Sequence, residues 1–511
     1  MDTPVLKMTN TVTEQVKLGV AHNQSPPFAD FLGVNGFEWD FTQSGKNSID
    51  SVMFKNILSF GGFRHYLDWE KIEATKDTFT FNPAHNGGFN YDTIYQASAQ
   101  HHLPMLVTVQ NIPKWLEKTY PGADQANDNA PAPYGSNRSE PASYIDMARM
   151  GFQFAARYGN NKNIDASLLK IDKTPRWNSD PLNKVLAGLG WVHYLECGNE
   201  VDKTWKGKKG QLTAEEYAAN LSALYDGDMG KLGKGVGVKN ADTSMQVVMA
   251  GLADPDPNFV IKMINWCKQH RGYKKDGSVN LCFDVINYHF YENDAIPGTD
   301  KYTVGKAPEL SRAGQIADAF VAMSAKYANN MPVWITESGY DLNQKSKQRA
   351  IQIGQKSPEM VQADWELRSA FLYARHGLKR SFFYMLDDVN ANSETQYSSS
   401  GLVEGHHKRI ITDYILQTHQ LMGNYRYYQT ISSDPVVDVY LNSGKKMYVM
   451  YVPDETGRKV PTQLDLPGTT SATVYRLVPH SEAMKVEHVP VSNGKLKIEL
   501  TETPIFVERG N

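Results

Sequence analysis

The sequence predicts an α/β fold, a (β/α)8 TIM barrel followed by a C-terminal antiparallel β-sandwich. Eight short apolar runs between residues 31 and 424 alternate with polar loops and helical stretches, the pattern of parallel strands joined by right-handed crossovers. After residue 424 the pattern changes to alternating apolar and polar residues separated by turn signals. The chain has 511 residues, more than one core supports, since single cores stop growing near about 250–300 residues.

The eight runs are rich in β-branched and aromatic residues. Continuous apolar runs of this length are typical of strands that are buried on both faces. In chain order they are Phe31–Phe37, Ser59–Tyr66, Leu103–Val109, Trp191–Cys197, Met245–Leu252, Phe283–Phe290, Met331–Thr336 and Arg380–Leu386.

Helical spacing of apolar residues predicts helices between these runs. Thr213 followed by Glu216 has the pattern of a capping box, which predicts a helix start at residue 214. The four clearest helices are Tyr144–Tyr158, Ala214–Tyr225, Arg312–Tyr327 and Met360–His376. The 110–190 stretch holds the longest insertion between two strands.

We therefore divide the chain into an N-terminal segment, 1–30, a catalytic barrel, 31–424, and a β-sandwich accessory domain, 425–511. Val5–Leu18 alternate as well, so the N-terminal segment could add a strand to the sandwich. Asn442-Ser443-Gly444 and Asn493-Gly494 predict hairpin turns within the sandwich.

Composition excludes several classes of partner. Lys and Arg number 53 against 56 Asp and Glu, a net charge of −3, so gross basicity cannot drive binding to nucleic acid. No apolar run approaches the roughly 20 residues of a membrane span. The N-terminus has no signal-like pattern; we expect a secreted or periplasmic protein if a signal peptide has been removed, and a cytoplasmic location stays open. Cys197, Cys267 and Cys282 form no zinc motif or disulfide framework and are expected to be buried thiols.

Two carboxylates follow strongly apolar runs. Glu200 comes three residues after the fourth run, and Glu337 directly follows the seventh. The C-terminal ends of barrel strands converge on one mouth, so both side chains should meet there. A pair of carboxylates suits glycosidic bond cleavage, in which one protonates the departing oxygen and the other attacks the anomeric carbon or activates water. Either glutamate alone would more often be a loop ion pair or a helix cap.

Around these residues the chain resembles the clan A glycoside hydrolases, retaining glycosidases built on a (β/α)8 barrel. Their hallmark is an Asn-Glu pair ending the fourth strand and a Glu ending the seventh, matched here by Asn199-Glu200 and Glu337. The resemblance extends over about residues 31–511. Short sequences such as IPKWL and TESGY resemble family 39 most, with families 5 and 30 as neighbours.

The resemblance implies roles for individual residues. Glu200 would be the general acid/base and Glu337 the nucleophile of a double displacement on a β-linked glycan. Asn199 would bind the sugar 2-hydroxyl. Arg64, taken as the end of the second strand, would hold the nucleophile carboxylate with its cationic fork. A tyrosine after the sixth strand would bond the nucleophile; we expect Tyr291 there, with His289 touching sugar hydroxyls.

Aromatic side chains beyond strand ends are candidate platforms for sugar rings. Trp115 and Trp39 are the preferred ones. The sequence departs from the clan at the end of the eighth strand, where many members place Trp and this chain has Tyr384 or Met385. The Lys203–Lys209 run after Glu200 is interpreted as a solvated loop, with contact to an acidic sugar or a sulfate as the alternative.

Two other functions stay open. One is a non-catalytic carbohydrate-binding barrel. The other is a metal-dependent hydrolase using His65, His193 and His289. No HExxH, Gly-rich nucleotide motif or P-loop is present, and the leading hypothesis needs no cofactor and no metal. Its partner is an oligo- or polysaccharide; the sequence does not specify the sugar, the linkage, exo or endo action, or the oligomeric state.

Overall fold

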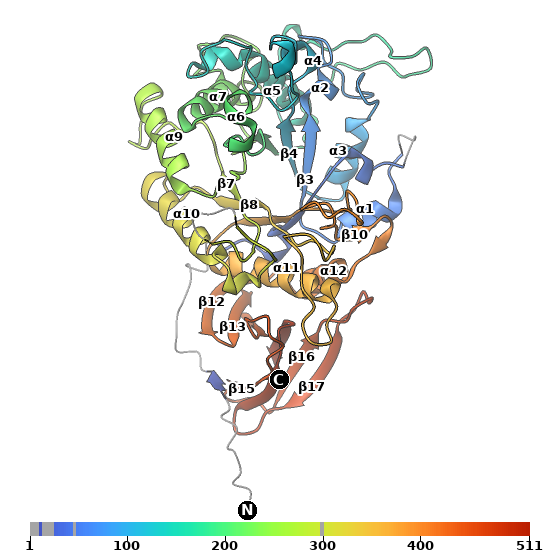
Figure 1. The fold of residues 1–511 in the computed structure, drawn as a ribbon, viewed down its shortest axis with the longest axis vertical. Helices are drawn as coiled ribbons and strands as arrows, with labels where there is room; N and C mark the ends of the chain where they lie inside the picture. Colours follow the sequence, from blue (N-terminus) through green and yellow to red (C-terminus); the bar gives the residue numbers. More distant parts are fainter. Residues whose placement is uncertain (1–9, 13–24, 44–47, 297–300, 511) are drawn as a thin grey trace, which may run out of the picture.

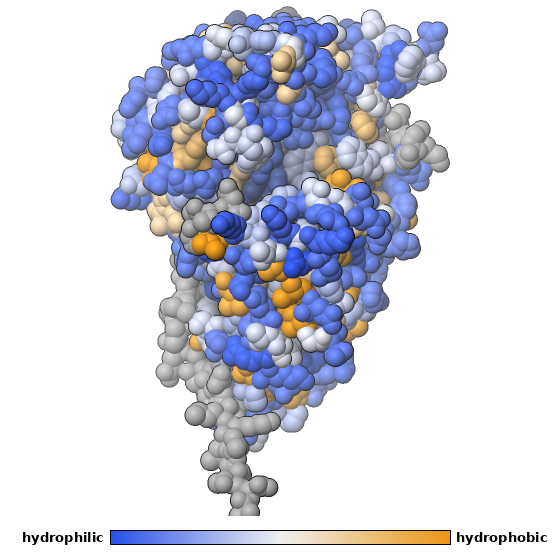
Figure 2. Space-filling model, viewed as in Figure 1, coloured by the Kyte–Doolittle hydropathy of each residue, from blue (hydrophilic) through white to orange (hydrophobic). Residues whose placement is uncertain are grey.

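A computed structural model describes residues 10–12, 25–43, 48–296 and 301–510. Figure 1 shows a barrel domain above a smaller β-domain, with helices α11 (Pro358–Arg375) and α12 (Ile410–Met422) between them. The face seen in Figure 2 is mostly hydrophilic and has a recess near the middle of the barrel domain. Within the described part of the chain, no helix is both long and apolar enough to cross a membrane.

Eight parallel strands form the barrel, as the sequence predicts. Their order in the sheet is β6-β5-β4-β3-β2-β9-β8-β7. Parallel bridges between Val248 and Val285 and between Leu252 and Tyr288 join β6 to β7 and bring the sheet close to closure. The strands are β2 (Leu32–Gly36), β3 (Phe63–Asp68), β4 (Met105–Gln110), β5 (Tyr194–Cys197), β6 (Gln246–Met249), β7 (Ile286–His289), β8 (Val333–Glu337) and β9 (Arg380–Phe383).

Helices surround the sheet and bury its outer face. Thr213 and Glu216 form the predicted capping box at the start of α7, and each cap accepts a backbone N–H of the other. Besides α11 and α12, the longer helices are α1 (Ser51–Ile57), α3 (Tyr91–Gln100), α5 (Ile145–Tyr158), α7 (Ala214–Asp226), α9 (Pro257–His270) and α10 (Ala313–Tyr327). Short ones are α2 (Trp69–Ile72), α4 (Lys114–Glu117), α6 (Gly207–Gly210) and α8 (Val238–Ala241).

The second barrel strand, β3, starts and ends later than predicted, which changes the position of Arg64. It starts at Phe63 and runs to Asp68, two residues past the predicted end. The preceding glycines form the turn into the strand. Only glycine fits at position 61, because a Cβ there would lie 1.5 Å from the carbonyl oxygen of Ala29. Arg64 is therefore the second residue of β3, inside the barrel, and the prediction that it ends the strand is wrong.

The C-terminal domain is a sandwich of two sheets. The larger has the order β12-β13-β14-β19-β16-β17 and the smaller β1-β15-β18. In β1, Asn10–Val12 pair in parallel with Thr462–Leu464; the rest of the alternating Val5–Leu18 stretch lies outside the described residues. The strands are β12 (Arg426–Ser433), β13 (Val436–Asn442), β14 (Lys445–Tyr451), β15 (Val460–Asp465), β16 (Ser471–Arg476), β17 (Lys485–Pro490), β18 (Lys495–Leu500) and β19 (Ile505–Arg509). A short hairpin of β10 (Val403–Glu404) and β11 (His407–Lys408) belongs to the barrel domain.

Both predicted hairpin turns are present, and at the second Ser492 and Lys495 form an isolated antiparallel bridge. Ser443 and Gly444 have positive φ and connect β13 to its antiparallel neighbour β14. Asn493 and Gly494 also have positive φ, yet the strands on either side belong to different sheets, since β17 pairs with β16 and β18 with β15. This second turn carries the chain from one sheet of the sandwich to the other. The two sheets pack their apolar faces against each other to form the shared core.

The centre of the larger sheet, at β13, β14 and β19, is buried on both faces. One face packs on the smaller sheet, and the other packs on α11, where Phe371 lies 6.0 Å from the ring of Tyr440 and 6.1 Å from that of Phe506. Arg375 of α11 binds Asp438 of β13 at 2.9 Å, and Asp438 is fully buried. The two domains therefore share apolar packing and a buried ion pair.

Several buried carboxyls make stability depend on pH. Burial raises the pKa of Asp40 and of Glu292 to about 7 and that of Glu73 to about 8. Burial also acts to raise the pKa of Glu38, but His65, Lys71 and Tyr91 outweigh it and lower that pKa to about 2. When folding raises the pKa of a carboxyl, the group favours the folded state at pH values below its unfolded pKa, and this stability is lost as the pH rises through the folded pKa. For Glu38, whose pKa is lowered, the stability is present above the unfolded pKa and is lost as the pH falls toward 2.

We expect the melting temperature to be highest near pH 5 and to fall between pH 5 and 8, as these carboxyls ionise in a buried setting. Thermal unfolding followed by circular dichroism in half-unit pH steps measures it. Glu292→Gln removes one titrating group at nearly constant shape and should reduce the fall. A melting temperature that stays level or rises from pH 5 to 8 would contradict the expectation.

Candidate active site

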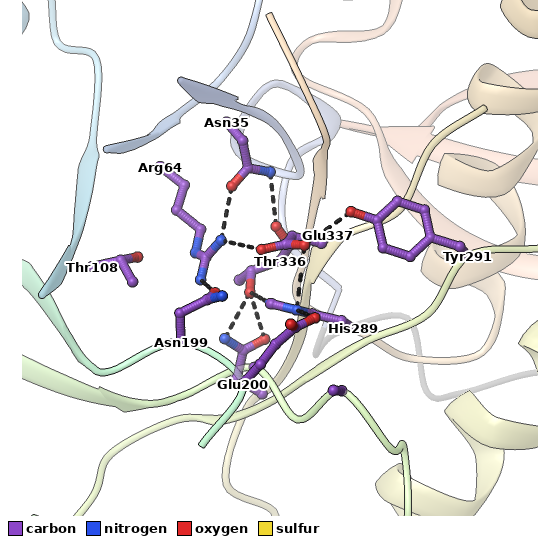
Figure 3. A network of polar contacts seen from close by, with 12 residues as sticks. Asn35, Arg64, Thr108, Asn199, Glu200, His289, Tyr291, Thr336 and Glu337 are labelled. Carbon is purple, nitrogen blue, oxygen red and sulfur yellow. Dashed lines mark hydrogen bonds and ion pairs between the residues drawn. The ribbon is translucent and has the colours of Figure 1, made fainter. Parts of the chain in front are cut away.

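The two glutamates singled out in the sequence meet at the C-terminal mouth of the barrel (Figure 3). Glu337 is the last residue of β8, and Glu200 lies three residues beyond β5. One carboxylate oxygen of each, together with a ring nitrogen of His289 at the end of β7, lies within 4.8 Å of the others. Convergence of strand ends in a parallel barrel explains why residues so far apart in sequence come together.

Glu337 is buried and held at both oxygens. Its Oε1 accepts hydrogen bonds from Arg64 Nη1 at 2.9 Å and from the Tyr66 hydroxyl at 2.5 Å. Its Oε2 accepts one from the Tyr291 hydroxyl at 2.9 Å. Only 7% of the side chain is exposed, so the carboxylate keeps one orientation.

These contacts keep Glu337 ionised. Burial acts to raise its pKa, but the charges of His289 and Arg64, with the hydrogen bonds from the two tyrosines, outweigh burial and lower the pKa below its ordinary value. The carboxylate therefore stays charged at neutral and mildly acidic pH. Such a carboxylate can attack an electron-poor carbon.

Arg64 joins the two halves of the site. Its Nη2 donates to the side-chain oxygen of Asn199 at 2.8 Å, while its Nη1 reaches Glu337. The other edge of the guanidinium forms a bidentate pair with Glu196 of β5, with Nε to Oε2 at 2.6 Å and Nη2 to Oε1 at 3.0 Å. Arg64 and Glu196 are both fully buried, so this pair fixes where the fork points.

Glu196 was not predicted from the sequence, and neither was Tyr66. Glu196 is satisfied by Thr108, Gly251 N–H and Asn287 in addition to Arg64. The signal for both residues was present: Glu196 is a charged residue within an apolar strand, and Tyr66 follows Arg64 by two positions, on the same face of β3. A charge inside a buried strand requires a buried partner.

His289 lies between the two glutamates. Its Nδ1 is 3.1 Å from Glu200 Oε1 and 3.4 Å from Glu337 Oε2, and its Nε2 is 3.1 Å from Thr336 Oγ1. A Cβ at Gly251 would lie 1.9 Å from Nε2, so only glycine leaves room for the ring. The expected contact of His289 with sugar hydroxyls stays a prediction, while its polar contacts within the chain are to the two carboxylates and to Thr336.

Glu200 sits on a strained stretch of backbone. Its φ is 47°, in the left-handed region, and Gly198 before it has a φ of 89°. For a residue with a Cβ this conformation costs about 1–2 kcal/mol. Hydrogen bonds from Glu200 N–H to Gly251 and from Lys203 N–H to Glu200 maintain it. The turn aims a side chain that is 23% exposed at the mouth, unlike the enclosed Glu337.

The predicted aromatic platforms lie in different surroundings. Trp39 is 55% exposed and stacks on Phe37, whose ring stacks in turn on Tyr66. Trp115 is partly buried; it packs edge-on against Trp69, and its indole N–H donates to the Glu73 carbonyl.

The end of the eighth barrel strand presents Tyr384 to the site, while Met385 is buried. The ring of Tyr384 lies 6.2 Å from that of Tyr66 and 6.5 Å from that of Tyr291. An aromatic ring therefore borders the nucleophile candidate where the clan often has Trp, and the two residues that the sequence left open are separated.

The histidines of the metal hypothesis are not brought together. His65 bonds the Tyr95 hydroxyl through Nδ1, and its Nε2 lies 3.5 Å from Glu38. His193 is exposed just before β5. In the described ranges, the only group of acidic, histidine or cysteine ligands close enough to hold a metal ion is Glu200, His289 and Glu337. All three cysteines are buried and free, as expected.

Comparison with known proteins identifies the fold. No protein-family model matches the chain, and no curated protein matches it. Among solved structures, a family 39 glycoside hydrolase from the gut symbiont Bacteroides cellulosilyticus WH2 has a TM-score of 0.63 at 15% identity, over 96% of this chain and 83% of that one. A glucosidase from Croceicoccus marinus has a TM-score of 0.57 at 12% identity, over all of both chains.

A third similar structure is AbfB, a family 51 alpha-L-arabinofuranosidase from Bifidobacterium longum, with a TM-score of 0.56 at 13% identity over all of both chains. At these identities the likeness establishes architecture: a barrel with an appended sandwich, as in glycoside hydrolases of families 39 and 51. The fold likeness agrees with the clan A resemblance seen in the sequence.

Proposed function

We propose that the protein is a retaining glycoside hydrolase that cleaves a β-linked glycan by double displacement. The observation that carries the proposal is the carboxylate pair, with one oxygen of Glu200 and one of Glu337 within 4.8 Å. Retaining enzymes hold their two carboxyl groups about 5–5.5 Å apart, whereas inverting enzymes need about 6.5–9.5 Å to fit a water molecule. The nearest oxygens of Glu200 and Glu337 are closer than either of these group separations, which supports the shorter, retaining arrangement.

In the first step Glu337 attacks the anomeric carbon while Glu200 protonates the departing oxygen. The unequal surroundings of the two side chains support this division of roles. Glu337 is charged, buried and fixed by Arg64 and two tyrosines, as a nucleophile requires. Glu200 is more exposed, and among the described residues only His289 lies at ion-pair distance from it, so it can exchange a proton.

His289 is suited to keep that proton available. Thr336 Oγ1 donates to Asn287 Oδ1, so its oxygen can accept a hydrogen bond from His289 Nε2–H. The other ring nitrogen, Nδ1, is 3.1 Å from Glu200 Oε1, so a hydrogen bond links the ring to the proposed proton donor. In the second step Glu200 takes a proton from water, which attacks the glycosyl-enzyme and releases Glu337.

Asn199 is the proposed partner of the sugar 2-hydroxyl. Its side-chain oxygen is occupied by Arg64, which leaves its NH2 group to donate to the sugar beside the nucleophile. Hydrogen bonds at this hydroxyl strengthen in the transition state. In the alternative, a non-catalytic binding barrel, the strained turn at Glu200 and the buried network around Arg64 would lower stability and serve no function.

Product stereochemistry tests the proposal. A panel of aryl glycosides and polysaccharides identifies a hydrolysed substrate, and proton NMR then follows the anomer that forms first. We expect the β-anomer from a β-linked substrate, before mutarotation. First formation of the α-anomer would contradict double displacement, and binding without hydrolysis across the panel would favour the non-catalytic alternative.

A further inference from the structure

A cavity of about 250 Å³ opens beside Glu200. Asn199 and Glu200 form part of its wall, together with the 110–131 loop and the 198–212 segment. None of the groups that hold Glu337, namely Arg64, Tyr66 and Tyr291, lines it. The cavity thus extends from the reaction centre on the side of the proton donor. Its volume, below the roughly 300–1,000 Å³ of drug-sized ligand sites, suits a single sugar unit.

The lysines of the Lys203–Lys209 run differ in their partners. Lys206 forms an ion pair with Asp128, and Lys209 forms one with Asp124, so both tie this segment to the 110–131 loop. Lys208 is exposed and does not line the cavity. Lys203 is partly buried and lines the cavity, and no carboxylate of the described residues lies within ion-pair distance of its ammonium group.

Lys203 therefore presents to the cavity an ammonium group that has no carboxylate of the described residues at ion-pair distance. Burial lowers the pKa of Lys203, opposed by the more distant charges of Asp128 and Glu200. A partly desolvated ammonium without a counter-ion is costly, and an anionic group of a ligand would relieve that cost.

Trp205 completes a sugar-binding wall. It lies two residues from Lys203 in the 198–212 segment, lines the same cavity and is 62% exposed. An exposed indole offers an apolar face to a pyranose ring. Platform and cation together match a sugar that carries one negative charge.

We propose that this cavity binds the departing unit of an acidic glycan, with Lys203 pairing with the carboxylate or sulfate of that unit. This inference rests on the proposed function, because the group that Glu200 protonates leaves on the side of the cavity. Recognition of the anion is local, since the protein carries a net charge of −3 and does not attract polyanions as a whole.

The test measures binding rather than turnover, so absence of hydrolysis would not affect its result. Isothermal titration compares D-glucuronate, D-glucose 6-sulfate and D-glucose on the unaltered protein, on Lys203→Met and on the matched control Lys208→Met. We expect at least one anionic sugar to bind about tenfold more tightly than glucose, because a charge-assisted hydrogen bond is added. Lys203→Met should lose this preference, and Lys208→Met should keep it.

The two anionic probes separate the sources of the charge, a uronic acid or a sulfated sugar. Equal affinities for charged and neutral sugars, no measurable binding of either anion, or equal effects of the two lysine variants would each overturn the proposal. Melting temperatures of both variants check that the exchange leaves the fold intact.

Discussion

Glu337→Ala should lower kcat by roughly 10⁴-fold or more, because it removes the nucleophile together with the anion that Arg64 and the two tyrosines hold. Azide should restore turnover by entering the space that the carboxylate leaves. It attacks the anomeric carbon directly, so a β-linked substrate would give an α-glycosyl azide. Initial rates and NMR of the azide product measure both effects.

The control for this variant is Glu499→Ala, which removes an exposed glutamate on β18 of the sandwich domain. It should keep full activity. Undiminished hydrolysis by Glu337→Ala, or a β-glycosyl azide from it, would contradict the assignment of Glu337 as nucleophile.

Glu200→Ala should lower kcat/KM by about 10²–10⁴-fold for substrates with poor leaving groups, since these need protonation as the bond breaks. Aryl glycosides with acidic phenols should lose much less in the first step and then accumulate the glycosyl-enzyme. Azide accelerates its breakdown and, attacking after one inversion, should give a β-glycosyl azide. The two azide products thus have opposite configurations and distinguish the two glutamates.

Comparison of leaving groups provides the control for Glu200. If the variant loses equal activity on phenols of all acidities, Glu200 does not act as the acid. An α-glycosyl azide from Glu200→Ala would instead exchange the proposed roles of Glu200 and Glu337.

The sequence was sufficient to predict the barrel because the pattern is local. Each buried parallel strand is a short continuous apolar run, and Asn199-Glu200 and Glu337 follow two of them at the ends that converge. The proposed reaction type rests on these two residues, whose positions follow from the topology of the barrel.

What the sequence did not predict depends on register and on distant partners. The apolar run Ser59–Tyr66 includes Gly61-Gly62, whereas β3 starts at Phe63. The sequence therefore predicts Arg64 at the strand end and gives Tyr66 no role. The role of Glu196 is visible only in the folded barrel, where β4 alone separates β5 from β3 and Glu196 pairs with Arg64. Trp39 and Trp115 cannot be ranked as platforms from sequence, because both follow strand ends. Only packing separates them, since Trp39 is 55% exposed and Trp115 packs against Trp69.

The packing of helix α11 against the sandwich limits how the two domains can be exchanged during evolution. Its Phe371 and Arg375 belong to the barrel domain by position in the chain, yet they complete the packing and the charge balance of the sandwich. A sandwich transferred to another barrel would leave Asp438 buried without its cation, a loss of several kcal/mol. Inheritance of the two domains as a single module therefore loses the least stability. Exchange of segments between related proteins is favoured in the loops around the mouth of the barrel.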